Sequence, residues 1–77
     1  METKTAKAIA LLNAKKLRDA FRIFKTFRGR FTPEEKRVIE IAYECMTGKA
    51  AFYSMLGINA EEMIKEAVIT IKSVYAL

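Results

Sequence analysis

The sequence predicts an all-α fold, a small bundle of three to four main helices plus one short helix. Apolar residues recur at helical spacing in four segments, and two of these segments begin with the residue pattern of a capping box. Only one short stretch has the β-branched composition of a strand, and a lone strand cannot form a stable sheet. The 77 residues, of which 52% are hydrophobic, are enough for one globular domain over residues 1–77.

The first two expected helices cover residues 5–13 and 16–28. The connection at residues 13–16 contains neither glycine nor proline, so the sequence leaves open whether the two segments form one long helix or a hairpin. Gly29 supplies the stop of the second helix. In that helix, apolar residues follow the spacing i, i+3, i+4, i+7 and i+10 on one face: Leu17, Ala20, Phe21, Phe24 and Phe27.

The third helix has the clearest start in the chain. Thr32 suits the N-cap, Pro33 suits the first helical position, and Glu35 completes a capping box. Gly48 is expected to end this helix. The inner face is expected to consist of apolar residues at helical spacing, namely Ile39, Ala42, Tyr43 and Met46.

The C-terminal part predicts a short helix over residues 50–56, closed by Gly57, and one further helix. Asn59 caps that last helix, with Glu62 at the capping-box position. Residues 68–71 are β-branched and would suit a strand, but the cap upstream and the lack of another strand candidate favour a helix.

Composition argues against catalysis and against a metal or other cofactor. The chain has no histidine, and Cys45 is its only cysteine, so a disulfide within the chain is impossible and a zinc ligand set is lacking. Two carboxylate pairs, at residues 34–35 and 61–62, lie in first helical turns, where the helix dipole accounts for them. We therefore expect a protein that is not an enzyme, with Cys45 buried as a small apolar side chain.

Charge is distributed unevenly along the chain. Residues 1–38 hold eleven basic and four acidic side chains and residues 39–77 hold three and five, so the halves carry +7 and −2. A basic half of this kind indicates a surface that faces a polyanion. Within it, four cations recur at i, i+3, i+7 and i+10 on the polar side of the second helix, and we call these four the basic face: Lys15, Arg18, Arg22 and Lys25.

The basic face leads to the main functional hypothesis, an accessory or regulatory binding protein that contacts nucleic acid, or a complex bound to nucleic acid. Arg28, Arg30 and Arg37 extend the positive charge through the following turn into the third helix. Such a row can follow the phosphates of a nucleic-acid backbone. An ordinary solvated helix face is the alternative interpretation of the same residues.

A second hypothesis is a protein–protein adaptor or inhibitor, with a homodimer as one form. Ile69 shares a helix face with Glu62, Glu66 and Ser73, so it is expected to be exposed in a monomer and to lie in an interface. The short apolar runs cannot span a bilayer, and the N-terminal apolar run is interrupted at Asn13, so we expect a cytoplasmic protein without a membrane partner.

Three resemblances bear on the fold. Residues 8–33 resemble a degenerate tetratricopeptide hairpin, with Lys15 where its turn glycine is expected, which implies two packed helices but no peptide-binding array. Residues 50–59 have the shape of a helix-turn-helix, although Tyr53 and the acidic helix start at residues 61–62 are unfavourable for it. The segments FRGRFTPEEKR (27–37) and FYSMLGI (52–58) resemble small uncharacterised helical proteins encoded by prophages, a resemblance that implies no activity.

Overall fold

A computed structural model of the chain describes residues 3–27 and 29–77. These residues form helices and turns without any strand, and they confirm the predicted all-α bundle, with four main helices where three to four were expected and one short helix. In chain order the elements are α1 (Lys4–Asn13), α2 (Leu17–Phe24), α3 (Pro33–Glu44), the wide turn η1 (Cys45–Lys49), α4 (Ala50–Met55) and α5 (Ala60–Tyr75).

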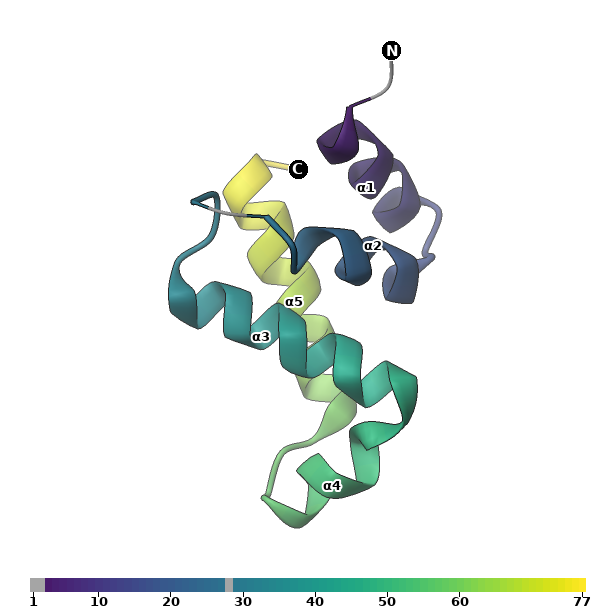
Figure 1. Cartoon of the computed structure of the whole chain (residues 1–77), viewed down its shortest axis with the longest axis vertical. Coiled ribbons are helices and arrows are strands. Elements are labelled where there is room, and N and C mark those ends of the chain that lie inside the picture. The colour runs from purple at the N-terminus through teal and green to yellow at the C-terminus, as the bar shows by residue number, and fades with distance from the viewer. Residues whose placement is uncertain (1–2, 28) are drawn as a thin grey trace.

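The long helices α3 and α5 pack against each other and form the middle of the molecule (Figure 1). Helices α1 and α2 pack together at one end, and α4 lies at the other end of the long axis. The molecule measures 42 × 23 × 19 Å, so these two ends are well separated. The largest fully buried side chains come from α2, α3 and α5: Phe21, Phe24, Ile39 and Ile71.

The segment 5–28 forms two separate helices that pack against each other, which answers the question that the sequence left open. Helix α1 closes in a Schellman motif, because Lys16 N–H donates to the Leu11 carbonyl at 2.9 Å and Lys15 N–H donates to the Leu12 carbonyl at 3.0 Å. Lys15 has a φ of +62° in this motif, a left-handed conformation that glycine adopts more easily. The chain therefore turns sharply without the glycine or proline that usually signals a turn.

Helix α2 ends at Phe24, earlier than the predicted end near residue 28. Its last turn tightens, since Thr26 N–H donates to the Ile23 carbonyl at 3.1 Å and Phe27 N–H donates to the Phe24 carbonyl at 3.1 Å. The Thr26 hydroxyl also donates to the Ile23 carbonyl, at 2.7 Å. A threonine hydroxyl that satisfies a helix carbonyl in this way competes with continuation of the helix.

The cap of α3 is the complete capping box that the sequence predicts. Glu35 N–H donates to Thr32 Oγ1 at 3.1 Å, and Thr32 N–H donates to Glu35 Oε1 at 2.8 Å. At the start of α5, Asn59 Oδ1 accepts a hydrogen bond from Glu62 N–H at 3.1 Å, so this cap consists of the bond from the helix backbone to the N-cap side chain. Residues 68–71 are helical, as the cap upstream favours.

The short helix α4 packs on a second, smaller apolar cluster that contains Ile41, Cys45 and Tyr53. Cys45 is buried, as expected, whereas Phe52 of α4 is 57% exposed. The reason is that α4 directs Tyr53 into this cluster, and the neighbouring position on so short a helix then faces solvent. In residues 3–27 and 29–77, no helix has the length and apolar character required to cross a membrane.

Candidate nucleic-acid interface

The basic face begins at the turn between α1 and α2 and continues along α2. Lys15, Arg18 and Arg22 are all exposed, while Ala20, Phe21 and Phe24 of the same segment are buried. This division follows from the helical repeat, which places residues three and four positions apart on a common side. Arg18 and Arg22 therefore project outward from a helix whose opposite side is held in the core, and Lys15 lies in the turn before that helix.

Lys25, at the C-terminal end of the basic face, is only partly exposed. Its ammonium lies 5.0 Å from the centre of the Tyr43 ring of α3, which is a cation–π distance. A lysine over a ring keeps its charge and its N–H donors, so it remains able to bind an anion. The contact also makes Lys25 a packing residue, which matters when variants are chosen.

At its other end the basic face borders a shallow hollow of about 370 Å³. Six side chains from the turn, from α2 and from the region after α3 line this hollow: Lys15, Lys16, Leu17, Arg18, Asp19 and Met46. Three of the six are cations and one is a carboxylate, so the local charge is positive. Lys16, which the sequence hypothesis did not include, therefore belongs to this surface.

The remaining predicted cations are distributed differently. Arg37 lies on the exposed side of α3, where its guanidinium is 3.5 Å from the Glu40 carboxylate. This is the only ion pair among residues 3–27 and 29–77, so Arg37 is partly compensated and the cations of α2 are not. Arg28 lies outside the described residues. Arg30 is exposed in the segment between α2 and α3, beyond the C-terminal end of the basic face.

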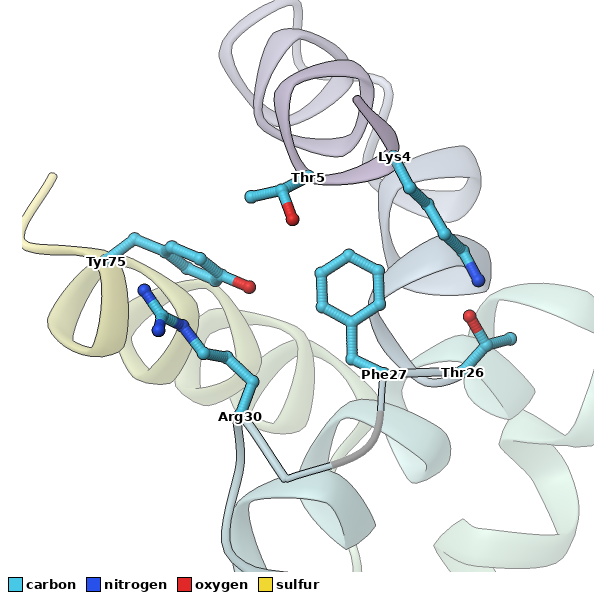
Figure 2. A pocket seen from close by; sticks show the side chains of 6 residues that line it. All are labelled: Lys4, Thr5, Thr26, Phe27, Arg30 and Tyr75. Atoms are coloured by element: carbon cyan, nitrogen blue, oxygen red, sulfur yellow. The ribbon is translucent and has the colours of Figure 1, made fainter. Parts of the chain in front are cut away.

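Arg30 belongs to a second group of residues, which the sequence did not indicate. Its guanidinium lies 4.8 Å from the centre of the Tyr75 ring, and the Lys4 ammonium lies 5.5 Å from the centre of the Phe27 ring. These residues line a hollow of about 560 Å³, which we call the aromatic hollow (Figure 2). Its six lining residues are Lys4, Thr5, Thr26, Phe27, Arg30 and Tyr75.

Residues from both ends of the chain and from its middle line the aromatic hollow. The ring centre of Phe24 lies 5.4 Å from that of Phe27 and 5.7 Å from that of Tyr75, so one buried ring positions both of these partly buried rings. Phe31 packs on the same group, 6.1 Å from Phe24. No local sequence signal links Lys4 to Tyr75, because 71 positions separate them and only the packing of α1, α2 and α5 brings them together.

Exposed apolar residues gather at the opposite end of the molecule. Phe52, Met55 and Leu56, which we call the α4 patch, are 57%, 86% and 61% exposed. Their spacing of i, i+3 and i+4 places them on one side of α4 and its C-cap. Ile69 is 67% exposed on α5, as expected, but the residues around it on that side of the helix are polar.

Two groups among the described residues have a pKa that differs from the ordinary value, the Cys45 thiol and the Tyr53 hydroxyl. Burial, together with the nearby Glu44 carboxylate, raises the pKa of the Cys45 thiol, which makes it less reactive. The Tyr53 hydroxyl donates a hydrogen bond to Glu44, and this bond, with burial, raises the pKa of Tyr53. Among the described residues, no three histidine, cysteine or carboxylate side chains are grouped to hold a metal ion.

Comparison with known proteins found no relative. No protein-family model matches the sequence, and no match was found among curated proteins or among solved structures. The resemblance to prophage-encoded proteins and the tetratricopeptide-like interpretation of α1 and α2 therefore stay predictions.

Proposed function

We propose that this protein is a non-enzymatic accessory or regulatory protein that binds the phosphate backbone of a nucleic acid through its basic face. One observation supports the proposal above the others. The exposed cations Arg18 and Arg22 lie one turn apart on α2, Lys15 is exposed in the turn before that helix, and no described carboxylate forms an ion pair with any of the three. Uncompensated cations on a fixed support attract a polyanion, whereas paired cations on a solvated face are largely neutralised.

The dimensions of α2 suit contact with consecutive phosphates. From Arg18 to Lys25 the helix advances seven residues, which corresponds to about 10 Å at 1.5 Å per residue. Phosphates along one strand of duplex DNA are about 3.4 Å apart along the axis, so this row covers roughly three phosphates. Lys15 and Lys16 extend the row beyond the N-terminal end of α2.

Binding of this kind does not read the base sequence. Lysine and arginine contacts to phosphate fix the position of a protein on the nucleic acid without discriminating between bases. The helix α5 is also unsuited to enter a groove first, because it begins with the exposed carboxylates Glu61 and Glu62. We therefore propose sequence-independent binding, consistent with an accessory role.

The test is fluorescence anisotropy of labelled duplex and single-stranded DNA, measured at several salt concentrations. Four phosphate contacts give a slope of about −3.6 in a plot of log K against log salt for duplex DNA. Reversal of charge in the double variant Arg18→Glu/Arg22→Glu removes two of them and is expected to halve the slope. Arg18 and Arg22 are chosen over Lys25 because they are exposed and Lys25 packs on Tyr43.

A matched control uses the two exposed lysines of α5. The double variant Lys65→Glu/Lys72→Glu changes the net charge by the same amount away from the basic face, and it is expected to retain the slope. Unfolding curves of both variants should resemble the wild type, since exposed charges contribute little to stability. Absence of binding by the wild type at low salt, or equal losses in both variants, would contradict the proposal.

A second candidate function is self-association through the α4 patch. Three large exposed apolar side chains on one side of a short helix form the type of surface that a partner covers. A second copy of this chain suits the patch on electrostatic grounds. A two-fold dimer through α4 would keep the basic ends of both copies, at α1 and α2, far apart (Figure 1).

Light scattering over a range of protein concentrations tests this second function. A dimer through the α4 patch predicts that Met55→Lys yields a monomer, while Ile69→Lys, which adds the same charge on α5, leaves the dimer intact. The opposite result would place the interface at Ile69. A wild-type protein that is monomeric at high concentration would exclude both surfaces as self-association sites.

A further inference from the structure

The aromatic hollow has the composition of a site for an anion. Two of its six lining residues, Lys4 and Arg30, are cations, and none is a carboxylate. Three others carry hydroxyl groups, of which Thr26 already donates to the Ile23 carbonyl, so Thr5 and Tyr75 are the available hydroxyl donors. Figure 2 shows the Tyr75 hydroxyl directed toward the middle of the hollow. Cations and hydroxyl groups are the donors that bind phosphate oxygens most strongly in proteins. The hollow therefore favours a phosphate group over a cationic or neutral ligand.

The rings hold the two cations in position without blocking their donors. Arg30 lies over Tyr75 at 4.8 Å, and a guanidinium stacked on a ring still directs its N–H groups outward along its edges. Lys4 lies over Phe27 at 5.5 Å and likewise keeps free N–H donors. Because the rings limit the conformations of these long side chains, a phosphate meets donors that are already partly ordered.

Phe27 adds an apolar surface beside the cations. Its ring packs against Phe24 at 5.4 Å and against Phe31 at 6.5 Å, and its remaining surface lines the hollow. Figure 2 shows this ring in the centre, between Lys4 on one side and Tyr75 on the other. Any nucleobase can pack on such a ring, whatever the base sequence, because every nucleobase has a π face.

We propose that the aromatic hollow binds a nucleotide, with its phosphate on Arg30 and its base against Phe27. The hollow of about 560 Å³ is within the range of about 300–1,000 Å³ that is usual for small-molecule sites. The choice of a nucleotide over another phosphorylated aromatic compound rests on the proposed nucleic-acid binding. The nucleotide is either free or the terminal nucleotide of a single strand, since both present the same phosphate and base.

The experiment titrates the 77-residue chain with five probes and follows the resonances of the aromatic rings by nuclear magnetic resonance. The probes are adenosine monophosphate, adenosine, inorganic phosphate, and a short single strand with or without a 5′-phosphate. Adenosine monophosphate is expected to shift the Phe27 and Tyr75 resonances and to bind more tightly than adenosine or inorganic phosphate. Tighter binding of the 5′-phosphorylated strand identifies a strand end as the ligand, and tighter binding of adenosine monophosphate identifies the free nucleotide.

Variants separate the hollow from the basic face. Arg30→Gln removes a charged donor and is expected to weaken nucleotide binding about tenfold. Phe27→Leu is expected to weaken the binding of adenosine monophosphate about tenfold and to leave the affinity for inorganic phosphate unchanged. Arg18→Gln, which removes the same charge from the basic face, should leave nucleotide binding intact. Circular dichroism of each variant establishes that the helices are preserved, and Arg30, being exposed, keeps the test valid if Phe27→Leu unfolds.

Failure of this inference is distinguishable from failure of the proposed function. Duplex binding that depends on Arg18 and Arg22, without shifts on adenosine monophosphate, would overturn the nucleotide site alone. Equal affinity for inorganic phosphate and adenosine monophosphate would also overturn it, because the base would then make no contribution. Binding of adenosine monophosphate that is weakened about tenfold in Arg30→Gln and kept in Arg18→Gln supports the nucleotide site even where the duplex does not bind.

Discussion

Lys15 is expected to limit the stability of the protein while it contributes to binding, and replacement by glycine separates the two effects. Lys15 occupies the left-handed position of the Schellman motif that ends α1, with a φ of +62°. Gly57 occupies the same position at the end of α4, where Ile58 N–H donates to the Tyr53 carbonyl at 2.9 Å. Ala76, with a φ of +55°, occupies the same position at the end of α5, so glycine fills one of these three turns and lysine and alanine fill the other two.

The magnitude follows from the backbone alone. A left-handed conformation costs a non-glycine residue about 1–2 kcal/mol. Glycine avoids that cost but loses about 0.5–1 kcal/mol through the greater freedom of its unfolded state. Lys15→Gly is therefore expected to raise the free energy of unfolding by about 0.5–1 kcal/mol. For 77 residues at about 2.1 cal/mol/K each, the unfolding entropy is roughly 160 cal/mol/K, so Tm should rise by about 3–6 °C.

The assay is thermal unfolding followed by circular dichroism, together with the salt dependence of DNA binding. Lys15→Gly also removes one cation of the basic face, so the slope should become less negative by about 0.9. Lys15→Ala removes the charge but keeps the left-handed strain, and it should change the slope without raising Tm. Lys16 has a φ of −88°, which any residue adopts, so Lys16→Gly should not raise Tm. A Tm for Lys15→Gly at or below that of Lys15→Ala would refute the reasoning.

Two further predictions concern single hydrogen bonds. Thr32→Ala removes the acceptor for Glu35 N–H and should lower the free energy of unfolding by about 1 kcal/mol, seen as a Tm lower by several degrees, while Thr32→Ser keeps the acceptor and most of the stability. An unchanged Tm in Thr32→Ala would mean that the box does not stabilise α3. The hydrogen bond to Glu44 raises the pKa of Tyr53 above its ordinary value of 10.0, so above pH 10 the folded state keeps a proton that the unfolded state releases. The contribution of this bond to the free energy of unfolding is therefore complete below pH 10, and it declines as pH rises through the folded-state pKa. Denaturant unfolding across that range should show the decline in the wild type and a smaller one in Tyr53→Phe; equal profiles would contradict it.

Local sequence signals determined which segments are helical. The capping box at Thr32 and the cap at Asn59 involve residues three positions apart, so their hydrogen bonds depend on little beyond the segment itself. The apolar spacing in α2 likewise indicated which side is buried, and with it that Arg18 and Arg22 are exposed. The turn at Lys15 carried no such signal, because a lysine in a left-handed conformation is uncommon and is tolerated here by the packing of α1 on α2.

Only the tertiary structure decided which side chains meet across the chain. The sequence indicated an apolar helix at residues 50–56, but whether a neighbour covers Phe52 depends on where α4 lies relative to α3 and α5. The packing of the helices also places Lys25 over Tyr43 and brings Lys4 and Tyr75 into one hollow. A helix pattern defines the buried side of one element, whereas the partner of that side, and the hollows left between elements, follow from how all the helices pack around a common core.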